Sequence, residues 1–164
     1  MTETPFGCLG TLTSWENYMP LARAALYAQG VDIYLAPTWD SSDVWIATLR
    51  HVAKEGRVFV IRVNRCIRVF DVPEDVPHRS ELYGSPDDWL TLGNSAIVNP
   101  DGEILAGPLV REDGILYADV DPKVVRSARQ QFDAVGHYAR PDVLRLVVDT
   151  STRPSVSFAS PEAP

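Results

Sequence analysis

The chain has 164 residues, of which 45% are hydrophobic and 23% are charged, a composition typical of one globular domain. Acidic residues outnumber basic ones by 22 to 15, which gives a net charge of −7 at pH 7. A broad nucleic-acid-binding surface is therefore not expected, because such a surface needs clustered cations. No apolar run approaches the roughly 18–20 residues that cross a bilayer, and the first residues lack the pattern of a secretory signal. We expect a cytoplasmic protein without nucleic-acid or membrane partners.

The first part of the chain shows alternating strand and helix patterns. Hydrophobic periodicity and the positions of proline, glycine and serine predict, in chain order, a strand over 7–14, a helix over 20–30, a strand over 31–36, a helix from Ser41 or Ser42 to about 55, and a strand over 57–63. The helical spacing predicts a buried face on the first helix made of Leu21, Ala24, Ala25 and Ala28. For the second helix it predicts a buried face of Trp45, Thr48, Leu49 and Val52. This alternation indicates layered α/β packing.

The second part of the chain is less regular. Residues 65–92 contain three prolines and many acids, which indicates a long loop or a short irregular excursion. We then predict a β-hairpin over 94–98 and 103–106. A strand over 114–120 and a helix from Asp121 or Pro122 to about 132 follow. Residues 150–164, rich in proline and serine, are predicted to be a tail.

The segment Ser14-Trp15-Glu16 lies where the first predicted strand passes into the first helix. A nucleophile on a tight turn between a strand and a helix is exposed, and the following backbone N–H groups can stabilise an oxyanion. A serine before a helix is far more often a helix cap, because its hydroxyl satisfies an orphan N–H group. Spacing alone leaves both interpretations open.

The residues around this turn resemble the nucleophile segment of the nitrilases, in the carbon–nitrogen hydrolase family. The resemblance lies in Thr4-Pro5-Phe6-Gly7 and in the run from Leu12 to Arg23. Later blocks that resemble the family follow in order at 36–38, 50–57, 93–102, 105–108 and 132–142. Together they extend over about residues 4–148 and resemble the true nitrilase branch.

The resemblance implies a fold and a division of the chain. The fold is α/β, half of a nitrilase-type αββα sandwich, with a mixed sheet and helices on one face. Residues 1–149 would form the C-terminal half of a carbon–nitrogen hydrolase domain, and residues 150–164 a tail. Family members are roughly twice as long as this chain, so half of the site would come from elsewhere.

The resemblance also implies roles for the turn residues. The family nucleophile is a cysteine in a Cys-Trp-Glu motif, and Ser14 stands at that position. The backbone N–H of Trp15 would serve the oxyanion, with its ring in the core. Glu16 would support the site, or serve only as an acid at a helix N-terminus. The glutamate base and the lysine of the family come from the preceding half of the domain, and those segments would lie before Thr4.

No other residue is predicted to replace the missing groups. Cys8 and Cys66 do not stand at the nucleophile position, and two cysteines predict neither a disulfide framework nor a zinc site. Lys54 and Lys123 lie outside the catalytic-lysine context. His51 is predicted to be a packing residue. We expect no cofactor and no metal.

Three functional hypotheses remain. The first is a nitrilase-family module related to the hydrolysis of a nitrile to a carboxylic acid and ammonia, inactive alone. The second is a non-catalytic module that self-associates or pairs with an N-terminal half. The third, a serine hydrolase that uses Ser14, is the weakest because Ser14 has no base that the sequence can name. The expected partners are a small nitrile and either a second copy or an N-terminal half.

Overall fold

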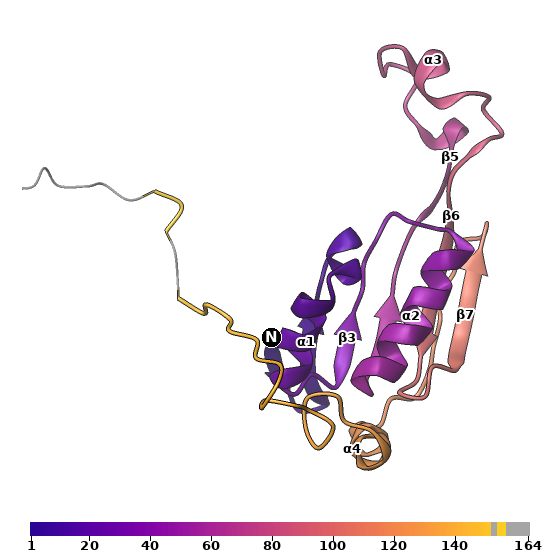
Figure 1. The fold of residues 1–164 in the computed structure, drawn as a ribbon. Coiled ribbons are helices and arrows are strands. Elements are labelled where there is room, and N and C mark those ends of the chain that lie inside the picture. The colour runs from indigo at the N-terminus through magenta and orange to yellow at the C-terminus, as the bar shows by residue number, and fades with distance from the viewer. Residues whose placement is uncertain (152–153, 157–164) are drawn as a thin grey trace, which may run out of the picture.

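The computed structural model describes residues 1–151 and 154–156. Its described residues form a mixed sheet of seven strands in the order β1-β2-β3-β4-β6-β5, with β7 also paired to β6 (Figure 1). Strands β2, β3 and β4 are parallel, and the other pairs are antiparallel. The strands are β1 (Thr2–Thr4), β2 (Gly7–Thr11), β3 (Ile33–Leu35), β4 (Phe59–Arg62), β5 (Cys66–Arg68), β6 (Trp89–Val98) and β7 (Ile104–Val110).

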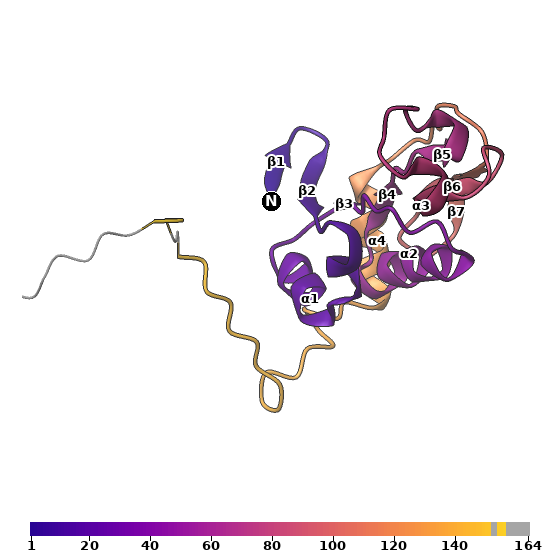
Figure 2. The ribbon, with the colours of Figure 1, turned by 90° about the horizontal axis from the view of Figure 1, so that it is seen from above.

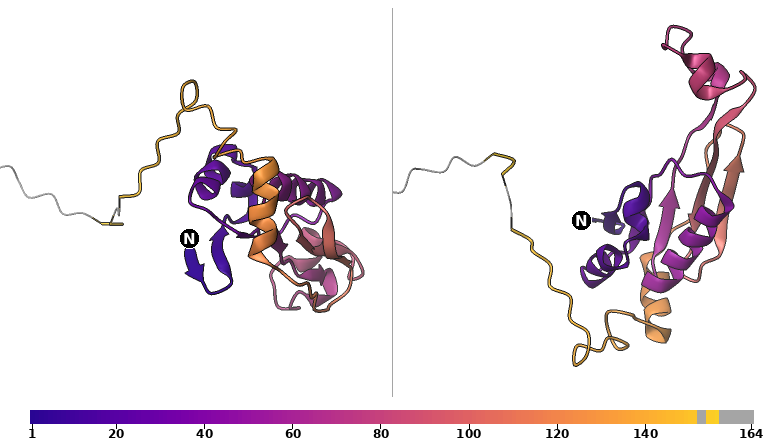
Figure 3. Two further views of the ribbon diagram at one scale, coloured as in Figure 1. Left: turned by 90° about the horizontal axis from the view of Figure 1, so that it is seen from below. Right: turned by 45° about the horizontal axis from the view of Figure 1, so that its top comes forward.

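Two helices lie on one face of this sheet. These are α1 (Pro20–Ala28) and α2 (Asp43–Gly56), as Figures 1 and 2 show. A third helix, α4 (Pro122–Gln131), lies across the end of the sheet where β3 begins (Figure 3). The predicted α/β class, with a mixed sheet and helices on one face, is confirmed. No helix among the described residues is long and apolar enough to cross a membrane.

The core lies between the sheet and α2. The side chains of Trp45, Leu49 and Val52 on α2 are buried, as the helical spacing predicts, and Thr48 is half-buried. The three buried side chains of α2 belong to one cluster with Tyr34, Val60 and Val98, which are neighbours across β3, β4 and β6. The predicted start of this helix is also confirmed, because the Ser42 side chain accepts a hydrogen bond from the Trp45 backbone N–H at 3.3 Å.

The opposite face of the sheet is also apolar. Strand residues alternate between faces, so the residues next to this cluster, Ile33, Leu35, Phe59, Ile61 and Ile97, point away from α2. Phe59 is buried, and it lines a small hollow together with Val120 and Val124 near the start of α4. Leu35 and Ile61 are only half-buried. This face is therefore incompletely covered by the described part of the chain.

The predicted buried face of α1 is wrong. Leu21 is 66% exposed, and the buried residues of α1 are Arg23 and Tyr27. Both reach Glu55 on α2: Arg23 Nε donates to its carboxylate at 2.8 Å and the Tyr27 hydroxyl donates at 3.2 Å. Helical periodicity predicts that polar residues face solvent. Arg23 and Tyr27 are buried instead, because their polar ends are paired with Glu55 and their apolar stems pack inside.

Several other segments differ from the predictions. The strand predicted over 7–14 ends at Thr11 and passes into a 3-10 helix, η1 (Ser14–Tyr18). Strand β1 was not predicted. The segment 114–120 forms no strand, because it pairs with no neighbour among the described residues, and its alternation places Ile115 and Tyr117 in solvent. The remaining hairpin and α4 are confirmed, although β6 and β7 are longer than predicted.

The irregular region over 65–92 contains short elements rather than an open loop. It includes β5, a 3-10 helix η2 (Val69–Asp71), the helix α3 (Arg79–Tyr83) and the start of β6. Figure 1 shows β5 and α3 protruding beyond the rest of the sheet. The predicted tail over 150–164 lies mostly outside the described residues.

Candidate active site around Ser14

Ser14 lies at the edge of the sheet where the parallel strands β2, β3 and β4 end. The loop over 36–42 follows β3 at this edge, and residues 63–65 follow β4. Ligands of open α/β sheets bind beyond the carboxyl ends of the strands. The fold therefore brings the predicted nucleophile position to the edge of the sheet that most often carries a site.

The backbone of Ser14 has a left-handed conformation, with φ at 53°. Such a conformation costs on the order of 1–3 kcal/mol for a residue with a side chain, and it persists only where neighbouring contacts hold it. The Ser14 N–H donates to the carbonyl oxygen of Pro37 at 2.8 Å, which ties the turn to the loop after β3. The turn is thus a strained backbone position with a defined support.

Asn17 is the main support of this turn and was not singled out by the sequence analysis. Its side chain is buried, and its amide donates to the carbonyl oxygens of Leu12 at 2.9 Å and Ser14 at 2.7 Å. Its side-chain oxygen accepts a hydrogen bond from the Tyr34 hydroxyl at 2.8 Å. Burial raises the pKa of Tyr34, so this phenol remains a neutral donor. Asn17 is one of several polar residues in the short helix Ser14–Tyr18, so the sequence alone does not single it out.

Glu16 closes the same turn from the other side. Its carboxylate accepts a hydrogen bond from the backbone N–H of Thr13 at 2.7 Å, the contact of a reciprocal helix cap. The Glu16 side chain is exposed. Its visible role is therefore to fix the turn.

The ring of Trp15 is 71% exposed, so the prediction that it lies in the core is wrong. Its neighbour Tyr18 instead packs edge-on against the buried ring of Trp45, with ring centroids 5.2 Å apart. Among the described residues, neither the Trp15 backbone N–H nor the Ser14 hydroxyl has a hydrogen-bond partner. The turn thus presents a free hydroxyl beside a free backbone donor, without a base next to the hydroxyl.

A polar network holds the neighbouring loops at this edge. The buried guanidinium of Arg62 donates to the carbonyl oxygens of Gly93 and Asp40, and burial lowers its pKa to about 10, so it stays charged at neutral pH. The Asn64 side chain donates to the carbonyl oxygen of Trp39 at 3.2 Å and to the Thr91 hydroxyl at 2.9 Å. This network fixes the loop that receives the Ser14 N–H.

The other candidate residues lie apart from this turn. Cys8 is inside β2, where its N–H donates to Asp32 at 2.9 Å. The Cys66 thiol donates to Asp113 at 3.4 Å, and burial raises its pKa. Lys54 and Lys123 are exposed on α2 and α4. The His51 side chain is 68% exposed, so its predicted packing role is wrong.

Within the described ranges, no group of three or more His, Cys, Asp or Glu side chains could hold a metal ion.

Comparison with known proteins shows the family of the chain. Residues 1–130 match the carbon–nitrogen hydrolase family. The chain is 45% identical over 154 residues to an aliphatic nitrilase of Sinorhizobium fredii, covering 94% of this chain and 49% of the relative. It is 44% identical over 161 residues to a bifunctional nitrilase/nitrile hydratase of Lupinus angustifolius, covering 96% and 46%.

A solved structure agrees with this match at the level of the fold. The carbon–nitrogen hydrolase of Helicobacter pylori G27 superposes with a TM-score of 0.69 at 22% identity, covering 86% of this chain and 49% of that one. The chain spans about half the length of the curated relatives that it matches. From its sequence match, supported by this fold, the chain belongs to the carbon–nitrogen hydrolase family.

Proposed function

We propose that this chain is the nucleophile-bearing half of a carbon–nitrogen hydrolase that converts a nitrile to a carboxylic acid and ammonia. Ser14 occupies the nucleophile position, the Trp15 backbone N–H is the oxyanion donor, and Glu16 positions the turn. The observation that carries the proposal is the left-handed Ser14 turn at the carboxyl edge of β2, beside an unpaired Trp15 N–H. The nitrilases among the relatives supply the substrate class.

The chemistry defines what the other half must contribute. The nucleophile adds to the nitrile carbon while its proton passes to a base, and the nitrile nitrogen takes a proton. One water then releases ammonia and leaves an acyl-enzyme, and a second water releases the acid. A serine hydroxyl depends on an adjacent base for this addition, whereas a thiol is activated more readily. Since the Ser14 hydroxyl has no hydrogen-bond partner among the described residues, we propose that the chain alone does not turn over nitriles.

The incompletely covered sheet face supports pairing with a complementary half. Leu35 and Ile61 present apolar side chains on the face away from α2, and both remain half-exposed. Apolar strand residues on both faces of a sheet are typical of strands that are buried on both sides. A complementary N-terminal half, with a base and a lysine, would cover this face and complete the site.

A reconstitution experiment tests this proposal. The chain would be combined with the N-terminal half of the Sinorhizobium fredii nitrilase, and ammonia release from aliphatic nitriles would be measured. We expect activity for Ser14→Cys with the added half and none for either half alone. Ser14→Ala, treated identically, is the matched control. Activity that is equal in Ser14→Ala and Ser14→Cys, or that is absent from a folded Ser14→Cys complex, would contradict the proposal.

The second candidate function is a non-catalytic module that self-associates. The unpaired Ser14 hydroxyl and the incompletely covered face favour it. Sedimentation analysis of the unmodified chain over a wide concentration range distinguishes the two. A concentration-dependent dimer that excludes the added half supports the second function, and a monomer that binds the half supports the first.

A further inference from the structure

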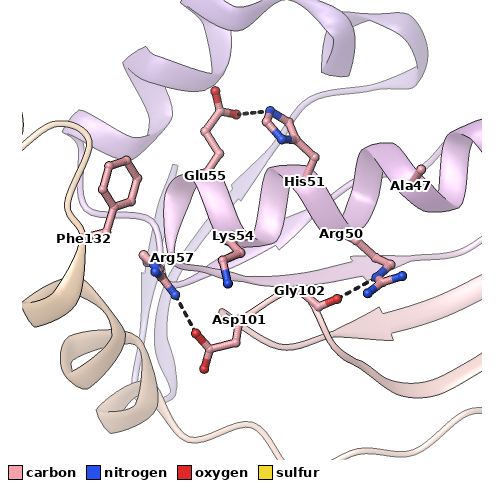
Figure 4. A pocket seen from close by; sticks show the side chains of 9 residues that line it. All are labelled: Ala47, Arg50, His51, Lys54, Glu55, Arg57, Asp101, Gly102 and Phe132. Carbon is pink, nitrogen blue, oxygen red and sulfur yellow. Dashed lines mark hydrogen bonds and ion pairs between the residues drawn. The ribbon is translucent and has the colours of Figure 1, made fainter.

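A hollow of about 780 Å³ lies against the carboxyl-terminal part of α2. Four residues of α2 at helical spacing, Ala47, Arg50, His51 and Lys54, line one side of it. The turn with Asp101 and Gly102 between β6 and β7 forms another side, and Phe132 after α4 forms a third (Figure 4). The hollow is separate from the Ser14 turn. Ser14 lies beyond the carboxyl end of β2, near the loop that leads into the start of α2, whereas the hollow lies at the other end of α2.

The two carboxylates of the hollow are already neutralised. Arg57 pairs with Asp101 at 2.5 Å, and Glu55 pairs with Arg23 at 2.8 Å. Glu55 also lies 3.9 Å from the His51 ring nitrogen. The hollow is therefore not expected to bind a cation, because both of its carboxylates are already paired with arginines.

Two cations of the lining remain without a carboxylate. Arg50 donates through Nε to the carbonyl oxygen of Gly102 at 2.8 Å, a bond that leaves its positive charge and its terminal N–H groups free. The side-chain ammonium of Lys54 makes no hydrogen bond or ion pair with any described residue. The carboxyl end of α2 opposes an anion with about half a negative charge, which is less than the two full positive charges of Arg50 and Lys54. The hollow is thus locally cationic in a chain of net charge −7.

Arg57 forms the buried end of the same hollow. Its side chain is 8% exposed, and within the described ranges its Nε is buried without a hydrogen-bond partner. Its guanidinium carbon lies 5.9 Å from the centre of the Phe132 ring. A buried donor without a partner, such as Arg57 Nε, lowers the stability of the fold. Arg57 also lines the cationic hollow.

We propose that this hollow binds the phosphate group of a small ligand. A phosphate carries close to two negative charges at neutral pH and several acceptor oxygens, which matches Arg50 and Lys54 in charge and in donors. The Phe132 ring and Ala47 provide apolar surface for an organic part of a phosphate monoester. The site involves none of the residues of the Ser14 turn, so it is independent of the proposed hydrolase function.

Titration of the intact chain, followed by the backbone amide signals in two-dimensional NMR, tests the site. The probes are inorganic phosphate and phenyl phosphate at constant ionic strength, with acetate and chloride as controls. We expect saturable shifts for residues 47–57 and 99–102 with both phosphates and none with the controls. Arg50→Gln and Lys54→Gln should each weaken binding roughly tenfold.

The other lysine of the chain provides a matched control. Lys123→Gln removes the same charge from α4 and should leave phosphate affinity unchanged. Tighter binding of phenyl phosphate identifies a phosphate monoester as the ligand, and equal binding identifies phosphate itself. An equal loss in Lys123→Gln and Lys54→Gln, or an absence of saturation below about 20 mM, would overturn the proposal.

Discussion

The two faces of the sheet have similar apolar strand residues but are covered to different extents. On the face of α2, Tyr34, Val60 and Val98 are all fully buried. On the other face most of the apolar strand residues are also buried, but Leu35 and Ile61, the direct neighbours of Tyr34 and Val60 along β3 and β4, remain half-exposed. The comparison shows that one face is completed within the chain. The other has the composition of a buried surface, but this part of the chain covers it incompletely.

The largest effect is expected on the covered face. Trp45→Ala removes a fully buried ring that also packs against Tyr18, and should lower the free energy of unfolding by about 3–5 kcal/mol. Urea denaturation measures this loss. Val44→Ala, which alters an exposed residue of the same helix, should change stability by less than about 0.5 kcal/mol. Equal losses in the two variants would contradict the placement of Trp45 in the core between α2 and the sheet.

A smaller effect is expected for the polar contact on the same face. Tyr34→Phe deletes the hydroxyl that donates to Asn17 and leaves a buried acceptor without a partner, at a cost of about 1–3 kcal/mol. Hydrogen exchange of the amides over 14–19 should accelerate, since Asn17 supports that turn. Tyr117→Phe, at an exposed position, is the control and should alter neither quantity.

A pair of substitutions in adjacent residues compares the faces directly. Val60→Thr places a hydroxyl in the core and should lower the free energy of unfolding by about 1–3 kcal/mol. Ile61→Thr makes a similar change on the incompletely covered face and should cost less than about 1 kcal/mol in the isolated chain. Thermal unfolding of both variants measures the difference. A larger loss for Ile61→Thr would mean that the second face is buried within the chain alone.

The last expected change is a loss of stability at alkaline pH. Burial raises the pKa of Tyr27 and of Tyr34 above the usual value of 10. Because a raised folded-state pKa favours the protonated form, this stabilisation is complete below pH 10 and is lost as the pH rises further. Absorbance at 295 nm should show these phenols ionising only as the chain unfolds. In the double variant with Phe at positions 27 and 34, stability should fall less steeply above pH 10.

Local signals predicted much of the fold but not every buried face. The Ser42 cap and the spacing of Trp45, Leu49 and Val52 predicted α2 well, because capping and burial act within one helix. The face of α1 was mispredicted because Arg23 and Tyr27 pair with Glu55, which is about 30 residues away in the sequence. The strand pattern over 114–120 failed for a related reason, since a strand requires a partner that its own residues do not specify.

At the candidate site, the sequence by itself determined the resemblance to the nitrilase nucleophile segment. It also placed Ser14, Trp15 and Glu16 between a strand and a helix. Only the tertiary structure decided the left-handed turn at Ser14, its support by Asn17 and Tyr34, and the exposure of the Trp15 ring. The physical reason is that strand and helix periods follow from neighbouring residues, whereas a strained turn is held by contacts between distant elements. The cationic hollow on α2 has the same origin, because its charge balance depends on which carboxylates the fold pairs with Arg23 and Arg57.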